Sequence, residues 1–555
     1  MRSRPFLVAA AILGVGLSLS ACQSQTPRRA ACPAGERCLE YGNGADPISV
    51  NPQIATATNE AAILRELFEG MFTDGPDGAP IKGVAQSYEV SPDGLVWTFH
   101  LRPDAVWSDG QPLTANDFVF AYRHMLDPKT GSTYSYLLYV LKNGAAVNNG
   151  AAAPETLGAK ALDARTLQLT LEHPASYLPQ LLKHQSFFPI PEHVVRRWGD
   201  QWATPGKLVG NGAYVLKEWR LGDYVRLEKN PLYRDAKDVC FDRVDFYPIT
   251  DAVAGERRTL RGELDINGGI QPSRVARLRA RPDWARYVRV HSYLSSGYVI
   301  FNTHDVAPLR DVRVRQAISM AIDRRFITDK IFRAVGQVPT TSFVPLGIAG
   351  YVPLNARPKA YWADFTYPQR QAEARRLLAA AGYGPGRPLQ LQFKTFNSPT
   401  SLEVIQSIQS DLKSVGIDTT IRLEDGIVAL QSFEIRDFQL GNAAWIADYD
   451  DPMTYLGLMK SDTGAQNYGD YKNPAYDALL DKADNEPDPG KRARTLAQAE
   501  QMMLDDADVA PIDTGVNLNL VSPKITGWVD NDVDIHPIRY LCRNDAARPV
   551  SKPTD

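Results

Sequence analysis

Apolar residues recur along this chain at two different spacings, and the two spacings alternate from one end of the sequence to the other. Every second residue is apolar at Leu167, Leu169 and Leu171, which is typical of a half-buried strand. Within Val312–Phe332, apolar residues stand at positions 314, 318, 322 and 326, a spacing of four that follows one face of a helix. Strand and helix signals therefore follow one another, which predicts a mixed α/β protein.

Capping and turn residues set the ends of several of these elements. Thr114, with Asp117 three residues later, begins a predicted helix over Phe118–Met125. Glycines at positions 382 and 416 stand where a left-handed residue would end the predicted helices Gln369–Ala381 and Ser407–Val415. The same patterns predict strands in Val96–Leu101, Tyr214–Glu228, Arg387–Phe396 and Ile417–Leu423.

The chain begins with a short apolar run. Met1-Arg-Ser-Arg4 precedes apolar residues from Phe6 to Leu19, which is the length of a secretory signal and too short for a membrane span. The run ends in Leu19-Ser-Ala-Cys22, which resembles the bacterial lipobox, where the cysteine is lipidated after cleavage just before it. We therefore predict a signal peptide over residues 1–21, a lipid on Cys22 and a flexible tether over residues 22–44. The alternative is an ordinary signal peptide followed by a chance cysteine.

Size, charge and cysteine content exclude several classes of protein. The 555 residues are too many for one hydrophobic core, since single domains usually stop growing at about 250–300 residues, so two or three domains are expected. The net charge of −3 provides no basic surplus for a nucleic acid. Lipidation of Cys22 would leave four other cysteines, which outside the cytosol can pair in three ways. We favour pairing Cys32 with Cys38 and Cys240 with Cys542.

Local signatures of catalysis and of metal binding are missing from the sequence. The eight histidines form no metal-ligand spacing, and there is no Gly-x-Ser-x-Gly elbow. Gly42-Asn-Gly44 and Gly210-Asn-Gly212 lack the third glycine of a phosphate-binding loop. A catalytic triad scattered through the chain stays open. These observations nevertheless favour a binding protein without metal or cofactor over an enzyme.

One segment combines an aromatic residue with several carboxylates: Asn442-Ala-Ala-Trp445-Ile446-Ala-Asp448-Tyr449-Asp-Asp451-Pro452. Asp451 and Pro452 are typical of a helix start, as the N-cap and first residue of a helix that runs to Met459. Read alone, Trp445 and Asp448 would be a core residue and a loop residue.

This segment resembles the Trp-x-Ala-Asp-Tyr-x-x-Pro signature of periplasmic oligopeptide-binding proteins, the family 5 solute-binding receptors of ABC peptide importers. Further matches follow in order along nearly the whole mature chain, and together they identify the family. They are Asn51-Pro52, Leu67-Phe-Glu-Gly70, Val96–Arg102, Trp107-Ser-Asp-Gly110, Thr114–Phe118, Asn211-Gly-Ala-Tyr214, Asp311–Arg315 and Asp323-Arg324. The ligand stays open, because relatives bind dipeptides, murein peptides, nickel complexes, haem or sugars.

The resemblance implies an α/β fold of the type II periplasmic-binding kind, with two lobes that close about a hinge and an additional third domain. It places domain I at 45–68, 193–294 and 515–555, domain II at 69–192, and domain III at 295–514. The ligand would be enclosed between domains I and III by hinge closure, a two-state change that ligand contacts bias.

The resemblance also implies which residues hold the amino end of a ligand. Asp448 falls on the aspartate that binds a peptide α-ammonium, which needs an opposing carboxylate because an unpaired buried charge is very costly. Trp445 and Ile446 lie on the segment whose backbone pairs with the peptide main chain. Tyr134 matches a tyrosine near the N-terminus of the ligand.

A tyrosine-rich segment crosses into domain III in the family, and Tyr293 and Tyr298 match it; the alternative for both is a strand core. The family's disulfide between segments is absent here, because its two positions carry Ser295 and Ile446.

Departures from the family pattern fall where a ligand carboxylate would bind. Asn442 stands where the oligopeptide receptor has an arginine that helps receive that carboxylate, and Thr56 replaces a glutamate that contacts the ligand. A lysine that meets the carboxylate of longer peptides aligns near Phe332, so we predict the neighbouring Arg333 as its substitute. Asp448 is kept, and we therefore expect a ligand with a free amino group and altered C-terminal chemistry or length.

The sequence thus predicts a monomeric receptor of the cell envelope, lipid-anchored to a membrane on its periplasmic side, that captures peptides and delivers them to the permease subunits of an ABC transporter. The first alternative is the same receptor binding a murein peptide derivative, a metal chelate, haem or a sugar. A peptidase built on this scaffold is the remote alternative.

Overall fold

The structure is a computed structural model that describes residues 32–544. The predicted signal peptide, the predicted lipidation site Cys22 and residues 545–555 of predicted domain I lie outside the described residues. Contacts divide the chain into residues 1–36 and residues 37–555, and the fold below is that of the second unit. In the part of the chain that the structure describes, no helix has the length and apolarity to cross a bilayer.

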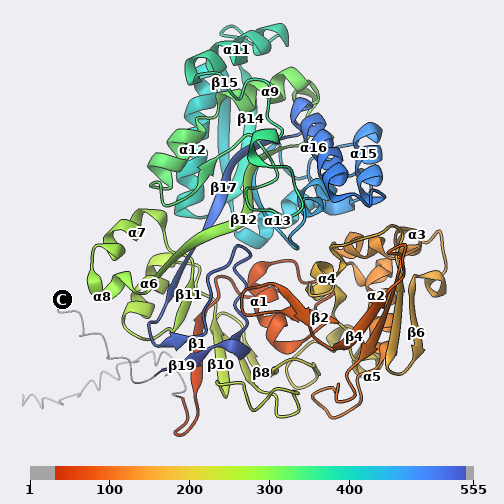
Figure 1. The fold of residues 1–555 in the computed structure, drawn as a ribbon. Helices are drawn as coiled ribbons and strands as arrows, with labels where there is room; N and C mark the ends of the chain where they lie inside the picture. The colour runs from red at the N-terminus through yellow and green to blue at the C-terminus, as the bar shows by residue number, and fades with distance from the viewer. Residues whose placement is uncertain (1–31, 545–555) are drawn as a thin grey trace, which may run out of the picture. The chain divides into compact units, whose positions relative to one another are not determined.

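The largest feature is a mixed sheet in which two long central strands, β12 and β17, run antiparallel through the middle (Figure 1). Its strands follow the order β15-β14-β16-β12-β17-β11-β1-β10-β9-β8, and β13 also pairs with β17. Their bounds are Cys38–Gly42 (β1), Tyr214–Arg220 (β8), Tyr224–Lys229 (β9), Arg243–Tyr247 (β10), Ile266–Gly268 (β11), Val288–Phe301 (β12), Val338–Pro339 (β13), Leu389–Phe396 (β14), Ile417–Glu424 (β15), Leu440–Ile446 (β16) and Val509–Val521 (β17).

The pairing of β12 with β17 is interrupted near its middle. Ser292 lies opposite Val516, and the next paired residue of β12 is Ser296, opposite Thr514. Within this gap Leu294 donates its N–H to the carbonyl of Asp532 at 2.7 Å instead of to β17. The ladder is therefore made of two separately paired halves.

Strand β1 corrects one boundary predicted from the sequence. The flexible tether was predicted over residues 22–44, but Cys38–Gly42 form a strand between the parallel strands β10 and β11. Leu39 in this strand is fully buried. Burial of these side chains and hydrogen bonding on both edges make this part of the chain a central strand of the sheet.

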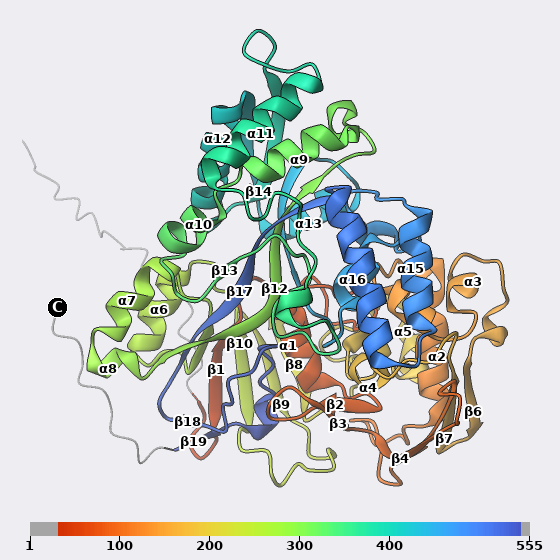
Figure 2. The same cartoon turned by 45° about the horizontal axis from the view of Figure 1, so that its top comes forward.

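Helices α9 (Val312–Ala321), α11 (Tyr367–Ala380) and α12 (Pro399–Val415) cover the end of the sheet that contains β14 and β15. Buried Ile318, Leu378 and Ile408 from these helices share one core with Phe393 of β14. At the other end of the long strands, α6 (Ala252–Leu260), α7 (Pro272–Arg279) and α8 (Pro282–Ala285) lie beside β12 and β17, as Figure 2 shows.

A separate antiparallel sheet has the order β4-β5-β7-β6, and α2 (Ala115–Leu126) packs against it. Its strands are Ala85–Val90 (β4), Val96–Leu101 (β5), Ala159–Asp163 (β6) and Thr166–Thr170 (β7). The backbone N–H of Thr114 donates to the carboxylate of Asp117 at 2.8 Å, and the two residues form the capping box that the sequence predicts.

The remaining elements are short or lie around these layers. Short strands pair as β2 (Phe72–Asp74) with β3 (Pro80–Lys82), and as β18 (Ile525–Thr526) with β19 (Cys542–Arg543). The other helices are α1 (Thr58–Leu67), α3 (Gly144–Asn148), α4 (Leu178–Leu181), α5 (Glu192–Trp198), α10 (Arg324–Phe326), α13 (Gly426–Glu434), α14 (Met453–Leu456), α15 (Pro474–Asp484) and α16 (Pro489–Asp505).

The prediction of one continuous helix over Val312–Phe332 is wrong. Helix α9 ends at Ala321, and the backbone of Ile322 is extended. The short helix α10 (Arg324–Phe326) follows, and then a single turn of π-helix (Ile327–Ile331), called the π-turn below. The guanidinium of Arg324 is buried and donates to backbone carbonyls, including that of Pro511 at 2.7 Å. These distant acceptors hold Arg324 in place, so tertiary hydrogen bonds override the helical spacing of the sequence.

Two other predicted elements differ in extent. The stretch Tyr214–Glu228 is a hairpin of two strands, β8 and β9, and not one strand. Helix α12 ends before Gly416 as predicted, with φ at +97°, but it begins at Pro399, eight residues before the predicted start. Ser398 caps this earlier start by accepting the N–H of Ser401 at 3.1 Å.

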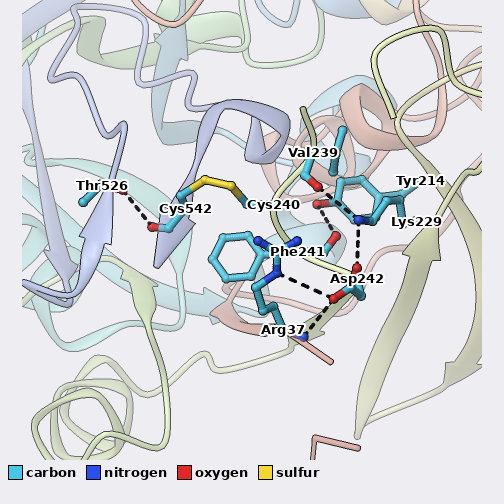
Figure 3. The surroundings of a disulfide bond; sticks show 9 residues. All are labelled: Arg37, Tyr214, Lys229, Val239, Cys240, Phe241, Asp242, Thr526 and Cys542. Carbon is cyan, nitrogen blue, oxygen red and sulfur yellow. Dashed lines mark hydrogen bonds and ion pairs between the residues drawn. A yellow bond between two sulfur atoms is a disulfide. The ribbon is translucent and has the colours of Figure 1, made fainter. Parts of the chain in front are cut away.

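A disulfide joins Cys240 to Cys542 across 302 residues, with Cα atoms 5.3 Å apart, which confirms this half of the predicted pairing. Figure 3 shows it next to Asp242, which accepts the backbone N–H of Arg37 at 2.9 Å and contacts the ammonium of Lys229 at 2.8 Å. Cys32 and Cys38 are each disulfide-bonded. The bridge between Cys240 and Cys542 ties the last described segment to the strands at the middle of the chain.

Candidate ligand-binding site

A cavity of about 610 Å³ lies at the carboxyl ends of strands in the main sheet. Residues 41–45 at the end of β1 and residues 268–269 at the end of β11 line it, and these two strands are parallel neighbours. Helix α1, the end of β16 and residues 533–538 complete the wall. In open α/β sheets, ligands bind outside the carboxyl ends of the strands.

Helix α1 is held in this wall by the Gly210-Asn-Gly212 segment, for which no phosphate loop was predicted. The N–H of Gly212 donates to the carbonyl of Leu67 at 2.9 Å, and a Cβ at Gly210 or Gly212 would collide with the backbone at this helix end. The side-chain amide of Asn211 donates to the carbonyl of Glu69 at 2.8 Å and accepts the N–H of that residue. The two glycines therefore allow two backbones to approach closely.

Asp448 is the most unusual acid in the cavity wall. Its side chain is 11% exposed, and its Oδ1 accepts the hydroxyl of Tyr134 at 3.3 Å. Its Oδ2 is buried and has no hydrogen-bond partner among the described residues. Burial raises the pKa of this carboxyl to about 7, against the opposing effect of the Tyr134 hydrogen bond. An ionised Asp448 would therefore attract a cation strongly.

The nearest basic side chain does not supply that cation. His184 Nε2 lies 3.8 Å from Asp448 Oδ1, but burial lowers the pKa of this imidazole to about 3, so it is neutral at physiological pH. No lysine or arginine in the described part of the chain forms an ion pair with Asp448. The carboxylate thus faces the cavity without a counterion.

Stacked rings hold Tyr134 against Asp448. The Tyr134 ring lies 5.5 Å from that of His184 and 6.4 Å from that of Trp445, with interplanar angles of 25° and 20°. Trp445 Nε1 is buried and has no partner within residues 32–544. The stack fixes the direction of the tyrosine hydroxyl and leaves one indole donor available.

Strand β16 presents a backbone edge to the cavity. On one side β12 pairs with it from Leu440 to Ile446, whereas on the other side β14 pairs only with Leu440 and Gly441. Beyond Gly441, no described strand covers this second edge, and residues 444–447 line the cavity. An extended chain can add to such an edge through main-chain hydrogen bonds.

Three further acids and one arginine also line the cavity. Glu66 Oε1 accepts the N–H of Ile538 at 2.8 Å, its Oε2 is buried without a described partner, and burial raises its pKa to about 7. Burial also raises the pKa of Glu434. Asp534 is hydrogen-bonded to neighbouring amide and imidazole groups, and Arg65 is ion-paired with Asp74 at 3.1 Å.

Asp534 belongs to a group of three residues that could hold a metal ion. The ligand atoms of His291, Asp534 and His536 lie within 4.8 Å of one another, a proximity that sequence spacing does not reveal. The Asp534 carboxylate already accepts the amide of Asn519 at 2.8 Å and contacts His536 Nε2 at 2.9 Å. These contacts are those of a hydrogen-bonded cluster.

The structure brings five of the eight predicted ligand-binding residues to the cavity wall: Asp448, Trp445, Ile446, Tyr134 and Tyr293. Thr56, where the family has a glutamate, lines the cavity as well. Ser295 and Ile446, which replace the family's disulfide, lie directly opposite one another in the pairing of β12 with β16.

The other three predicted residues lie outside the cavity wall. Tyr298 is 1% exposed, and its ring packs edge-to-face on that of Phe343 with the ring centres 5.0 Å apart. Tyr298 is therefore a core residue of its strand, which was the alternative to a ligand-binding role. Asn442 lies opposite Val299 within the ladder, and Arg333 is exposed just after the π-turn, with φ at +59°.

Sequence reasoning missed six acidic, basic or imidazole side chains of the cavity: Arg65, Glu66, His184, Glu434, Asp534 and His536. Arg65 and Glu66 directly precede the Leu67-Phe-Glu-Gly70 match, which was the one available signal. His184 and Glu434 stand in no motif and reach the cavity only through the packing of their elements.

Residues 79–467 match the model of the bacterial extracellular solute-binding proteins, family 5 (middle region). The chain is 33% identical to the periplasmic oligopeptide-binding protein OppA of Salmonella typhimurium, over 95% of this chain and 96% of OppA. The structure is similar to that of the Escherichia coli murein tripeptide binding protein MppA, with a TM-score of 0.87, 32% identity, and coverage of 92% and 99%.

A peptide complex is also similar. Haemophilus influenzae OppA in complex with RPPGFSPFR fits with a TM-score of 0.86 and 31% identity over 92% of this chain and 99% of that one. The unliganded open form of MppA is 32% identical and covers 92% and 98%, but its TM-score is only 0.66. By TM-score, the structure of this protein is therefore more similar to the peptide complex than to the open form.

These relatives are binding proteins and not enzymes. The matches span most of the chain and nearly the full length of each relative, which confirms the predicted α/β, type II periplasmic-binding fold. The chain therefore belongs to family 5 of the bacterial extracellular solute-binding proteins.

Proposed function

We propose that this protein is a receptor that captures peptides in the cavity and binds their α-amino group at Asp448. The observation that carries the proposal is Asp448, which lines the cavity, forms no ion pair with a lysine or arginine of the described residues, and has a buried Oδ2 without a hydrogen-bond partner among them. An ammonium group would supply both the missing hydrogen bond and the missing charge.

The uncovered edge of β16 supports a peptide over other amines. Main-chain pairing with residues 444–447 would bind an extended peptide whatever its side chains, and this segment begins four residues before Asp448. The structural similarity to a receptor in complex with RPPGFSPFR supports the same assignment.

The cavity is lined by segments of all three predicted domains: residues 56–66 of domain I, Tyr134 and His184 of domain II, and residues 444–448 of domain III. The domain boundaries and closure about a hinge stay predictions. The better fit to the peptide complex than to an open form supports a closed state of such a motion.

The proposal places the receptor at the cell envelope, on the periplasmic side, as a monomer that delivers peptides to the permease of an ABC importer. The N-terminal apolar run that ends in Leu19-Ser-Ala-Cys22 supports export and lipid anchoring through Cys22. Relatives that are named periplasmic support the location.

Calorimetry with Ala-Ala-Ala and N-acetyl-Ala-Ala-Ala tests the amino-group contact. We expect the acetylated peptide to bind far more weakly, and Asp448→Asn to lose about 3–5 kcal/mol of binding free energy for the free peptide, as expected when one partner of a buried ion pair is removed. Equal affinities of the wild-type protein for the two peptides would contradict the proposal.

A murein peptide derivative is the second candidate, because the structure is similar to that of a murein tripeptide binding protein with a TM-score of 0.87. Mass spectrometry of ligand that copurifies with the full-length protein separates the two candidates. A peptide of ordinary amino acids supports the first, and one containing murein residues supports the second.

A further inference from the structure

A peptide enclosed in the cavity would bring a carboxylate as well as an amine. An inference about the residue that binds this carboxylate rests on the proposed function. Among the described residues that line the cavity, Arg65 is the one arginine or lysine. The two histidines in the wall do not compete with it: His184 is neutral because burial lowers its pKa to about 3, and His536 contacts the carboxylate of Asp534 at 2.9 Å.

Arg65 shares its partner with a second cation. Its Nε donates to Asp74 Oδ2 at 3.1 Å, while Lys183 Nζ donates to Asp74 Oδ1 at 2.8 Å. One carboxylate thus faces two positive charges. The terminal amino groups of the Arg65 guanidinium make no hydrogen bond within residues 32–544, and the side chain is 18% exposed.

Cations and acids gather around Arg65 at this end of the cavity. Glu66 stands next to Arg65, but Arg539 is also close enough to lower the pKa of Glu66. Arg65, Lys183 and Arg539 all act on the carboxylate of Asp74, and Glu69 is ion-paired with Arg234. Asp74 is bonded only to the Nε of Arg65 and shares its other oxygen with Lys183, so it leaves the terminal amino groups of Arg65 for a ligand.

We propose that Arg65 binds the carboxylate of the ligand through the terminal amino groups of its guanidinium, while Asp448 binds the amine. A guanidinium matches a carboxylate with two parallel hydrogen bonds. Both residues line the same cavity, and the charge of Arg65 lowers the pKa of Asp448. The cavity therefore takes short zwitterionic peptides, with both charged ends inside.

Calorimetry with Ala-Ala-Ala and its C-terminal amide, at pH 7.5, measures the preference for a free carboxylate. We expect the wild-type protein to bind the acid about tenfold to a hundredfold more tightly, the range of a hydrogen bond to a charged group. Arg65→Gln should bind both peptides equally, and Arg65→Lys should restore part of the preference. Asp74 keeps Lys183 as a partner in both variants, which favours a folded protein.

Arg333→Gln is the matched control, because Arg333 is exposed and lies outside the cavity wall. It should leave the preference for the acid unchanged. The inference about Arg65 is overturned if the wild-type protein binds acid and amide equally, if Arg65→Gln weakens both peptides by the same factor, or if Arg333→Gln removes the preference. In each of these cases Ala-Ala-Ala still binds; if it does not bind the wild-type protein at all, the proposed function itself fails.

Discussion

The carboxyl group of Asp448 shows how position changes the chemistry of a single residue. Burial raises its pKa to about 7, because the charged form loses its hydration without gaining a cation. A ligand ammonium would reverse this by stabilising the ionised form. Binding of an amine is therefore expected to lower the pKa of Asp448 and to release a proton near neutral pH.

The affinity for Ala-Ala-Ala should accordingly depend on pH. Below about pH 7 the free protein holds the proton, so affinity should fall roughly tenfold for each further pH unit, until the pKa of the complex is reached. Above about pH 8 the peptide amine itself loses its proton, so affinity should fall again. Calorimetry between pH 5 and pH 9 measures both limbs.

Asp448→Asn is the control for the acidic limb. Glu66 also has a pKa raised to about 7 and lines the same cavity. If the acidic limb persists in Asp448→Asn and disappears in Glu66→Gln, then Glu66 and not Asp448 carries the dependence.

At the scale of single elements, local signals predicted where helices begin and end, whereas tertiary contacts decided where one is interrupted. The capping pair Thr114 and Asp117 and the end at Gly416 involve residues at most four apart, so the sequence shows them directly. The break after Ala321 depends on Arg324 reaching the carbonyl of Pro511 on β17. No local pattern contains that partner.

Thr114→Ala should test the value of the capping box of α2. Loss of the Thr114 hydroxyl removes its hydrogen bond to the carboxylate of Asp117, at 3.0 Å, so we expect a loss of about 1 kcal/mol in the free energy of unfolding. Denaturant unfolding measures it. Thr114→Ser keeps the hydroxyl and should cost clearly less; an equal loss in both variants would show that the cap is not the cause.

At the scale of the whole molecule, the described C-terminal segment is joined to distant parts of the chain. The disulfide closes a loop across 302 residues, and residues 533–538 line the cavity. The bridge therefore restricts the unfolded chain and also helps to position one wall of the site.

Cys542→Ser should lower stability by roughly 2–5 kcal/mol, as the loss of native disulfides typically does. Thermal unfolding of the full chain measures this, and Cys240→Ser should give the same shift. We also expect weaker binding of Ala-Ala-Ala in both variants. A stability equal to that of the wild-type protein would mean that noncovalent contacts alone hold the segment.

The sequence by itself determined the family and several element boundaries, and it singled out the aspartate that we propose binds the amine. These depend on short runs of residues, such as the motif from Trp445 to Pro452, and on capping and alternation within a few positions. The same reasoning could not place Tyr298 or Arg333, because the face of an irregular strand and the exit of a π-turn depend on their neighbours.

Only the tertiary structure decided which charges meet in the cavity. Arg65, Tyr134, His184 and Asp448 are separated by up to several hundred residues, and packing of α1, the end of β16 and the segments that contain Tyr134 and His184 brings them together. Electrostatic and hydrogen-bond energies depend on distance and burial in space, which separation along the chain does not determine. The proposed amine contact could therefore be predicted from a motif, whereas the proposed carboxylate contact emerged only from the assembled cavity.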